Sequence, residues 1–340
     1  MRTPRPYITF CIPSLDSGKY LHVALDSLMR FDNRIEVLVV DDGSTDNSLS
    51  IAKSYAEKYR IFRILQQERK GHGGAINAAI KEAKGQYFKV LDSDDWVDVS
   101  ALSAFLRDLE RAESLPDLYI MDYTYWKGHE REERTVSYEN CLKEKRTLPL
   151  SEVGKMKRKQ HFSIHSTIVR LSLLKEKNIQ LPERCSYEDG YYVYACLNAA
   201  ETIRYIHRSL DQYWVGRSGQ SMSQENLFRK WKDVLSMGEL VYSSHDIAPL
   251  KKDEKNRFRL LSHHLEFAIG MAMFVSRSNG SEEAEGERKA FLLRLKEKNP
   301  AQARLILQRP IMKWMNLPGK IGKSITCSLY RLPWEEIGPH

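Results

Sequence analysis

Short apolar segments alternate with amphipathic segments over about the first ninety residues of the chain. Residues 7–12, 35–40 and 61–65 are rich in β-branched and aromatic side chains, as buried strands are. Helical leucine spacing follows the first of them at residues 21–28, and a helical pattern also covers residues 77–83. Strands separated by single helices predict right-handed crossovers and a parallel sheet. The predicted fold class is α/β, with a mostly parallel central sheet and flanking helices.

A fourth apolar run, residues 87–91, ends in the carboxylates Asp92, Asp94 and Asp95. Acids at the carboxyl end of a buried strand are typical of ligand sites in open α/β sheets. If the strand continues, Asp92 and Asp94 point to the same side and offer oxygen ligands suited to Mg²⁺ or Mn²⁺. The acids equally fit the start of a helix, which the pattern predicts after Trp96. These residues alone leave both interpretations open.

The other strands bring more polar and glycine residues to the same edge of the sheet. Pro13 and Ser14 follow the first strand, Asp41 and Asp42 the second, and a glycine-rich turn at residues 71–74 the third. Carboxylates here can accept hydrogen bonds from a base and a ribose, and glycines allow a nucleotide to approach the backbone. Ordinary turns and helix caps use the same residue types. Neither a dinucleotide fingerprint nor a Walker loop occurs in the sequence.

Four segments resemble, in order and spacing, the inverting GT-A fold glycosyltransferases of family 2. They are residues 8–28 (ITFCIPSLDSGKYLHVALDSL), 35–48 (IEVLVVDDGSTDNS), 70–98 (KGHGGAINAAIKEAKGQYFKVLDSDDWVD) and 183–197 (ERCSYEDGYYVYACL). The likeness covers roughly residues 7–220. It implies a nucleotide-sugar donor, most simply a UDP-sugar, and Mn²⁺ or Mg²⁺ as cofactor.

The resemblance also implies roles for single residues at the sheet edge. It assigns the base to Asp41 or Asp42, the ribose to Asp92 and the diphosphate-bound cation to Asp94, with Asp95 as a substitute for Asp94. The donor-binding residues expected on this basis are Pro13, Ser14, Asp41, Asp42, Gly71, Asn77, Asp92, Ser93 and Arg217.

A second acidic motif lies on the expected acceptor side. Glu188 and Asp189 open a helical pattern at residues 191–200 and match the family's Glu-Asp pair, whose second member resembles the general base. An acid in a first turn also stabilises the helix dipole, so Asp189 fits either role or both. Residues 161–165 (HFSIH) take the place of acceptor-contacting residues, where a histidine can instead be structural. The implied reaction is inverting sugar transfer to a hydroxyl of a glycan or lipid-linked acceptor, in cell-surface polysaccharide or glycolipid synthesis.

The pattern changes beyond the region of resemblance, where strands disappear. Residues 214–223 form a polar stretch that resembles a loop closing over the donor, with Arg217 as a phosphate contact, or they form an ordinary linker. Apolar residues recur with helical spacing over residues 258–275. We expect a catalytic domain over residues 1–220 and a helical extension over residues 221–340.

The end of the chain has an uneven charge pattern. Residues 301–334 contain six basic and no acidic residues, interleaved with apolar ones and broken by three prolines. The prolines exclude one long spanning helix. The pattern predicts contact with an anionic membrane surface through residues 301–334; the alternative is that the apolar residues of the tail pack on the catalytic domain and its basic side is a solvated face.

Composition narrows the partners and the compartment. The 340-residue chain has a formal charge of +8, which favours an anionic partner, but no nucleic-acid recognition motif accompanies it, so we expect no nucleic acid. Five dispersed cysteines without a Cys-x-x-Cys pair indicate a reducing compartment, and the longest apolar run, residues 267–275, is too short to span a bilayer. We expect a cytoplasmic protein, peripheral at the inner face of the cell membrane, with a homodimer as a further option.

Two other classes fit parts of the pattern. A sugar-phosphate nucleotidyltransferase usually carries a glycine-rich basic loop after its first strand, where this chain has residues 13–16 (PSLD). A non-catalytic glycan-binding module has no need of Asp92, Asp94 and Asp189 together. Both classes are therefore disfavoured.

Overall fold

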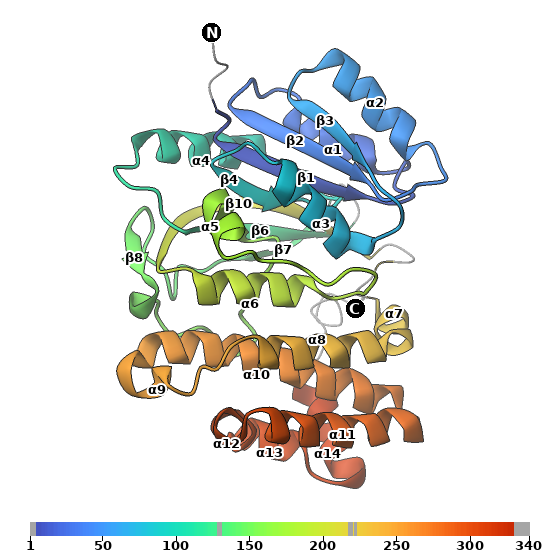
Figure 1. Cartoon of the computed structure of the whole chain (residues 1–340), viewed down its shortest axis with the longest axis vertical. Coiled ribbons are helices and arrows are strands. Elements are labelled where there is room, and N and C mark those ends of the chain that lie inside the picture. The colour runs from blue at the N-terminus through green and yellow to red at the C-terminus, as the bar shows by residue number, and fades with distance from the viewer. Residues whose placement is uncertain (1–4, 128–130, 217–219, 221–222, 330–340) are drawn as a thin grey trace. The chain divides into compact units, whose positions relative to one another are not determined.

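A ten-stranded sheet forms the centre of the first part of the chain in the computed structural model (Figure 1), which describes residues 5–127, 131–216, 220 and 223–329. The strand order is β3-β2-β1-β4-β9-β6-β10-β5, with β7 beside β6 and β8 beside β10. The strands are β1 (Ile8–Ser14), β2 (Ile35–Asp41), β3 (Phe62–Gln66), β4 (Tyr87–Val90), β5 (Trp96–Val97), β6 (Leu118–Lys127), β7 (Arg131–Val136), β8 (Thr147–Pro149), β9 (Thr167–Arg170) and β10 (Thr202–Val215).

The first four strands in spatial order run parallel, and the antiparallel pairs lie beyond them. β3, β2, β1 and β4 pair in parallel, whereas β9 is antiparallel to both β4 and β6, and β5 to β10. The helices of this part are α1 (Leu21–Leu28), α2 (Ser48–Lys58), α3 (Gly71–Glu82), α4 (Val99–Arg111) and α5 (Leu171–Glu176). The predicted α/β class with a mostly parallel sheet is confirmed.

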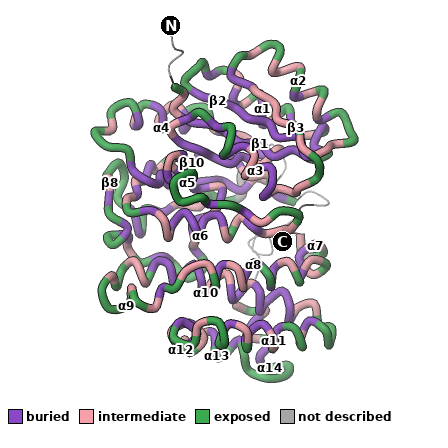
Figure 2. Tube along the Cα trace, viewed as in Figure 1, coloured by how far each residue is buried: buried purple, intermediate pink, exposed green. Residues whose placement is uncertain are grey.

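The central strands are buried along their whole length. All residues of β1, β2 and β4 are buried, and Figure 2 shows these strands in purple. Phe10 and Ile12 of β1 share a core cluster with Leu25 of α1 and with Leu102 and Phe105 of α4. Burial on both faces explains why these strands are continuous apolar runs rather than alternating ones.

The strands end at different positions from those expected. β1 continues through Pro13 to Ser14, because proline lacks only a donor and the Asp42 N–H still donates to the Ser14 carbonyl (2.9 Å). β4 ends at Val90, so the condition under which Asp92 and Asp94 would point to the same side, a strand that continues through both, is not met. The Asp95 N–H donates to the Asp92 carbonyl (3.1 Å), which closes a turn at this point.

The helix expected after Trp96 is present, although Asp98 is its cap. Residues Trp96–Val97 form the short strand β5, and α4 begins only at Val99. The Asp98 carboxylate accepts the Ala101 N–H at 2.7 Å, as a helix N-cap does. Capping therefore does not account for Asp92, Asp94 and Asp95.

Gly71 begins a helix rather than a turn. α3 starts at this residue, six positions earlier than predicted, so the glycine-rich segment forms its first turn. Gly71 has φ = +79°, and a Cβ atom there would lie 3.2 Å from the Arg184 nitrogen. Both the backbone conformation and the close approach of Arg184 require glycine.

The C-terminal part is helical throughout the residues that the structure describes, as predicted. Its helices, together with α6 (Asp189–Ala199), are α7 (Gln224–Arg229), α8 (Trp231–Ser244), α9 (Leu250–Asp253), α10 (Lys255–Asn279), α11 (Glu282–Lys298), α12 (Pro300–Leu307), α13 (Pro310–Met315) and α14 (Gly319–Leu329). In α10, Leu261, Leu265, Ala272 and Val275 are buried with the predicted spacing. Among the helices described, none combines the length and the hydropathy needed to cross a bilayer.

Internal packing divides the chain into two units. The first unit consists of Met1–Met156, Phe162–Cys185 and Ala199–Trp214, and the second of Lys157–His161, Ser186–Asn198 and Val215–His340. The sheet therefore belongs to the first unit, and α6 and the C-terminal helices belong to the second. The predicted domain boundary at residue 220 stays a prediction.

Some apolar residues of the basic tail are buried and others are exposed. α12, α13 and α14 each pack on α10 within the second unit, and Ile306, Met312 and Met315 are buried. Trp314 and Ile321 remain 56% and 68% exposed. The last part of the predicted membrane segment, residues 330–334, lies outside the described residues.

Candidate functional site

Asp42 anchors the start of α3. Its carboxylate accepts hydrogen bonds from the Gln67 side chain (2.7 Å) and from the backbone N–H groups of Lys70 and Gly71 (both 2.8 Å). These N–H groups belong to the helix terminus, where backbone donors lack intrahelical partners. Both oxygens of Asp42 are therefore engaged in holding the helix.

Asp41 has an acceptor to spare. Its side chain is buried, at 4% exposure, and its Oδ1 has no hydrogen-bond partner among the described residues. An unpaired buried acceptor costs about 1–3 kcal/mol, which a ligand donor at this edge would recover. Of the two neighbouring acids, Asp41 is thus the one whose carboxylate has an oxygen free to accept a hydrogen bond from a nucleobase.

The remaining predicted donor residues have varied surroundings. Pro13 and Ser14 are buried at the end of β1, where the Ser14 hydroxyl hydrogen-bonds with that of Ser17 (2.7 Å). The Asn77 amide bonds both the carbonyl and the N–H of Leu181 (2.8 and 2.9 Å), so it secures a loop of the same unit. Ser93 lies half-buried in the turn after β4, and Arg217 lies outside the described residues.

Asp92 lies beside the start of α3. The His72 Nε2 lies 3.3 Å from the Asp92 Oδ1, and the Asp92 side chain is 31% exposed. Burial by itself would raise the pKa of Asp92, but the His72 hydrogen bond and nearby positive charges outweigh it and lower that pKa. Asp92 is therefore an ionised carboxylate with access to solvent.

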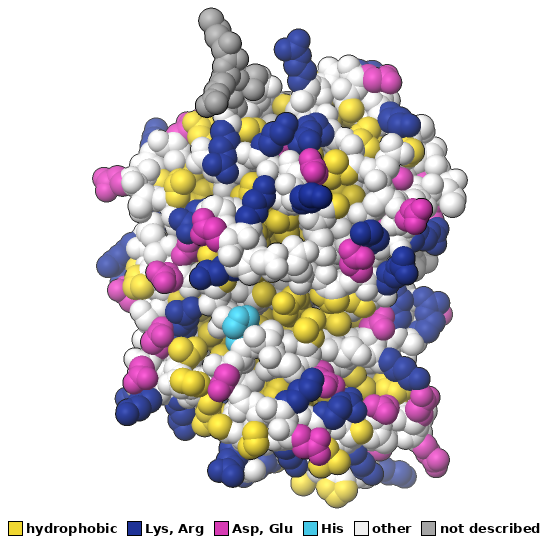
Figure 3. Space-filling model, viewed as in Figure 1, with side chains coloured by type: hydrophobic (Ala, Val, Ile, Leu, Met, Phe, Trp, Pro, Cys, Tyr) yellow, Lys and Arg dark blue, Asp and Glu magenta, His cyan; other side chains and the backbone are white. Residues whose placement is uncertain are grey.

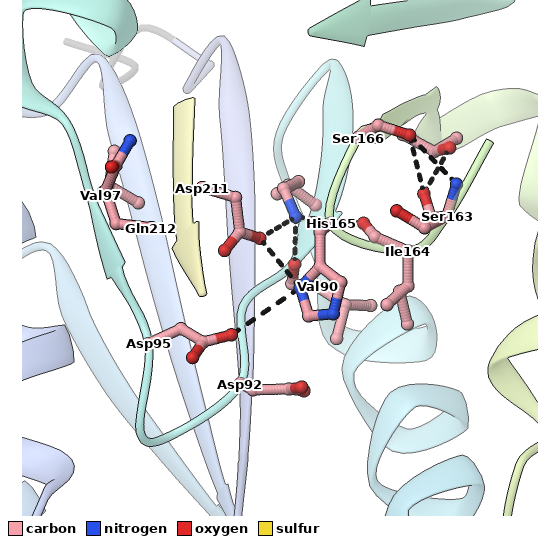
Figure 4. A network of polar contacts seen from close by, with 12 residues as sticks. Val90, Asp92, Asp95, Val97, Ser163, Ile164, His165, Ser166, Asp211 and Gln212 are labelled. Atoms are coloured by element: carbon pink, nitrogen blue, oxygen red, sulfur yellow. Dashed lines mark hydrogen bonds and ion pairs between the residues drawn. The ribbon is translucent and has the colours of Figure 1, made fainter. Parts of the chain in front are cut away.

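Asp95 faces inward from the same turn. Its Oδ1 accepts the Trp214 N–H at 2.9 Å, and its Oδ2 lies 3.6 Å from the His165 Nδ1 without a hydrogen-bond partner among the described residues. Burial, followed by the charges of Asp211 and Asp92, raises the pKa of Asp95 well above its usual value. Figure 4 shows Asp92, Asp95 and Asp211 around the His165 ring.

A fully buried ion pair lies beneath this turn. Lys89 and Asp211 are both 0% exposed, and the Lys89 Nζ lies 2.7 Å from the Asp211 Oδ2. The ammonium also donates to the carbonyls of Val90 (2.6 Å) and Ile164 (3.0 Å). This pair is not among the residues predicted from the sequence, although a lysine within the apolar run 87–91 needs a buried partner.

Three of these side chains form a group that fits a metal ion. Asp92, Asp95 and His165 each offer one ligand atom, and the three atoms lie within 4.8 Å of one another. Two carboxylates and an imidazole suit Mn²⁺, and the unpartnered Oδ2 of Asp95 is an available ligand. Asp94 is half-buried on the same turn but is not a member of this group.

Asp189 belongs to the second unit and opens α6, as predicted. Its side chain is half-buried, whereas that of Glu188 is buried at 2% exposure. The preceding residue, Tyr187, has φ = +70°. Burial, and then the charges of Asp233 and Asp189, raise the pKa of Tyr187 to about 12. Asp189 therefore presents a half-buried carboxylate in the first turn of α6.

The sequence of the chain is similar to those of known proteins. The model of Glycosyl transferase family 2 matches residues 9–175. The uncharacterized glycosyltransferase MG060 homolog of Mycoplasma pneumoniae is 30% identical over 227 residues, which cover 64% of this chain and 71% of the relative. The chain belongs to glycosyltransferase family 2. It is an enzyme that transfers a sugar from a nucleotide-sugar donor, and this sets aside the nucleotidyltransferase and the non-catalytic module.

A relative with a named activity aligns with more of this glycosyltransferase. It is the poly(ribitol-phosphate) beta-N-acetylglucosaminyltransferase TarS of Staphylococcus aureus, 28% identical over 278 residues, or 79% of this chain and 44% of TarS. The solved structure of S. aureus TarS 1–349 in complex with UDP-GlcNAc has a TM-score of 0.66 and 21% identity, covering 95% of this chain and 90% of that one. The glycosyltransferase therefore has a GT-A-like fold.

A more distant structure shares the fold. The mannosyltransferase PcManGT from Pyrobaculum calidifontis, in complex with GDP-Man and Mn²⁺, has a TM-score of 0.53 and 16% identity, covering 96% of this chain and 86% of that one. Similar folds thus hold different nucleotide sugars, one of them with a metal ion.

Proposed function

We propose that this glycosyltransferase uses a UDP-sugar and a divalent cation, Mn²⁺ or Mg²⁺, and transfers the sugar with inversion to a hydroxyl of a cell-surface polymer or glycolipid. The observation that carries the proposal is the grouping of Asp92, Asp95 and His165 at the carboxyl end of β4. A parallel sheet places its ligand at this edge. The UDP-GlcNAc bound by TarS supports a uridine donor.

The donor is held by residues from neighbouring strands. The Asp41 carboxylate, with its unpartnered oxygen, accepts a hydrogen bond from the base, while Asp42 keeps α3 in place. Asp92 accepts from a ribose hydroxyl and is common to two candidate cation sites. In one it acts with Asp94, as the sequence predicts, and in the other with Asp95 and His165. When bound, the cation neutralises the charge of the departing diphosphate.

The transfer needs a group that removes the acceptor proton. Asp189 takes this proton as the hydroxyl oxygen attacks the anomeric carbon from the face opposite the leaving group, which inverts the configuration. Its place at the first turn of α6 favours the carboxylate form. A polymer acceptor is supported by the similarity to TarS, a poly(ribitol-phosphate) beta-N-acetylglucosaminyltransferase, and a lipid-linked glycan meets the same chemical requirement.

Calorimetry with UDP tests the donor and the cation together. We expect UDP to bind the full-length protein at least about tenfold more tightly with Mn²⁺ than with chelator, because the cation screens the diphosphate from the acidic turn. GDP under the same conditions is the control for the preference for the uracil base over guanine. Equal UDP affinity with and without metal would remove the cation from the proposal, and equal affinity for UDP and GDP would remove the uridine preference.

The tail offers a surface for an anionic membrane. The side chains of Trp314, Leu317 and Ile321 are exposed, and the neighbouring Lys313 and Lys320 are exposed as well. Figure 3 shows hydrophobic side chains at the surface over the C-terminal helices, with Lys and Arg side chains nearby. Aromatic and aliphatic groups beside lysines suit the headgroup layer of an anionic bilayer, where each basic residue contributes about 1 kcal/mol.

Liposome flotation tests the membrane surface. We expect the full-length protein to float with anionic vesicles at low salt and the double variant Trp314→Ser/Ile321→Ser to bind about tenfold less, because it loses exposed apolar contact area. Leu293→Ser is the matched control, since Leu293 is 55% exposed on α11, outside the tail. Equal flotation of the double variant and wild type would show that the tail is structural.

A further inference from the structure

The C-terminal helices of the second unit form a groove with apolar and basic side chains. It consists of two adjoining hollows, of about 240 and 210 Å³, which share Lys296 of α11 and Leu307 of α12 in their lining. The first hollow is also lined by Met312 and Lys313 of α13, and the second by Arg304 of α12. α12 packs on both α11 and α13, and Figure 1 shows the three helices together. We call this feature the α11–α13 groove.

Within the described part of the chain, every charged side chain that lines the α11–α13 groove is basic. Lys296, Arg304 and Lys313 are exposed, and none of them has a carboxylate of a described residue within ion-pair distance. Lys298, two residues after Lys296, does have one, since its Nζ lies 2.8 Å from the Glu239 Oε1. Three cations without acidic partners around one groove produce a positive potential that attracts an anion.

The floor of the groove is apolar, which favours an anion with a hydrocarbon part. Met312 is buried and Leu307 half-buried in the lining. Each hollow is smaller than the roughly 300–1,000 Å³ of pockets that enclose a drug-sized ligand. A phosphate with a glycerol unit and the first methylene groups is small enough for such a groove, whereas two whole acyl chains are not.

The groove is continuous in the chain with the exposed apolar residues of the tail. Lys313 lines the groove, and the next residue, Trp314, is 56% exposed. Leu317, three residues further on, is 39% exposed. Aromatic and aliphatic side chains of this kind suit the headgroup layer of a bilayer. The chain therefore passes directly from the basic groove to the surface proposed to contact the membrane.

We propose that the α11–α13 groove binds the phosphate and glycerol of one anionic phospholipid, whose acyl chains stay in the bilayer. The inference rests on the membrane contact proposed above and adds a headgroup-selective site to it. Lys296 and Arg304 contact the phosphate, and Leu307 and Met312 contact the glycerol and the first methylene groups. A choline headgroup carries its own cation, which the basic side chains repel. A soluble phosphate polymer has no hydrocarbon part for the apolar floor.

A short-chain lipid below its micelle concentration tests the groove without a bilayer. Calorimetry follows dihexanoyl phosphatidylglycerol binding to the full-length protein, with dihexanoyl phosphatidylcholine and deacylated glycerophosphoglycerol as comparisons. We expect both comparisons to bind at least about tenfold more weakly, because the first adds a cation and the second lacks methylene groups for the floor. We also expect Lys296→Gln/Arg304→Gln to bind the phosphatidylglycerol about tenfold more weakly than wild type, since it loses two phosphate contacts.

Lys251→Gln/Lys252→Gln is the matched control. Both lysines are exposed on α9 in the same unit and do not line the groove, so this variant loses the same net charge and should bind as wild type does. Equal loss in the two double variants would show that only the overall charge matters and would overturn the inference.

Three further results would contradict the groove as a lipid site. They are no binding of the phosphatidylglycerol by wild type, unchanged binding by Lys296→Gln/Arg304→Gln, and equal affinity for glycerophosphoglycerol, which would make the occupant a soluble phosphate ester. Flotation with anionic vesicles separates this inference from the membrane contact on which it rests. If Lys296→Gln/Arg304→Gln floats as wild type does while Trp314→Ser/Ile321→Ser does not, the membrane contact stands and the groove has no part in it.

Discussion

Replacing Asp189 by asparagine is expected to lower kcat by about two to four orders of magnitude and to leave UDP affinity within about threefold of wild type. The variant keeps the size and hydrogen-bonding shape of the side chain but cannot accept the acceptor proton. Asp189 belongs to the second unit. The predicted donor-binding residues that the structure describes belong to the first. We therefore expect the substitution to affect turnover and not donor binding. The measurement is UDP release, with calorimetry for the affinity.

Asp233→Asn is the control for this prediction. Asp233 lies in the first turn of α8 in the same unit, and its charge, like that of Asp189, acts on Tyr187. Its variant should turn over within about threefold of wild type, because removing a surface charge does not remove the base. Near-normal turnover of Asp189→Asn would show that another group takes the proton.

Replacing Asp92 by alanine is expected to lower kcat/KM by about three orders of magnitude and to abolish the effect of Mn²⁺ on UDP binding. Asp92 belongs to both candidate cation sites, so its loss weakens cation binding whichever of the two is correct, and a bound cation supplies several kcal/mol of stabilisation to a leaving diphosphate. Turnover and metal-dependent calorimetry measure the two effects. The melting temperature checks that the variant is folded.

Asp98→Asn provides a comparison close in sequence. Asp98 caps α4 and takes no part in the acidic group, so its variant should lose little stability and keep its Mn²⁺ response. A full response to Mn²⁺ in Asp92→Ala would contradict both candidate cation sites.

The sequence predicted the parallel strands because their burial on both faces produces unbroken apolar runs. It predicted the C-terminal helices because one apolar face of α10 recurs with helical spacing. It missed the early start of α3, since glycine is a poor helix former, and the reason for Gly71 is the approach of Arg184, more than a hundred residues away. Distant contacts of this kind leave no local pattern.

The same limit applies to the site. The ordered motifs predicted the acids at the sheet edge. They did not predict which of Asp41 and Asp42 keeps an unpaired oxygen, because that depends on which carboxylate accepts the backbone N–H groups at the start of α3. The Lys89–Asp211 pair joins residues 122 positions apart. Its partner could not be read from the sequence, although the lone lysine in an apolar strand showed that one was needed.

The most direct measurement is release of the nucleoside diphosphate, UDP or GDP, from a panel of nucleotide sugars that includes UDP-GlcNAc and GDP-Man, with Mn²⁺ or chelator, by wild type, Asp92→Ala and Asp189→Asn. We predict that wild type releases nucleotide from at least one UDP-sugar only when metal is present, and that both variants lose this activity by two or more orders of magnitude. Release that is insensitive to chelator and to both substitutions would contradict a metal-dependent transfer at this site.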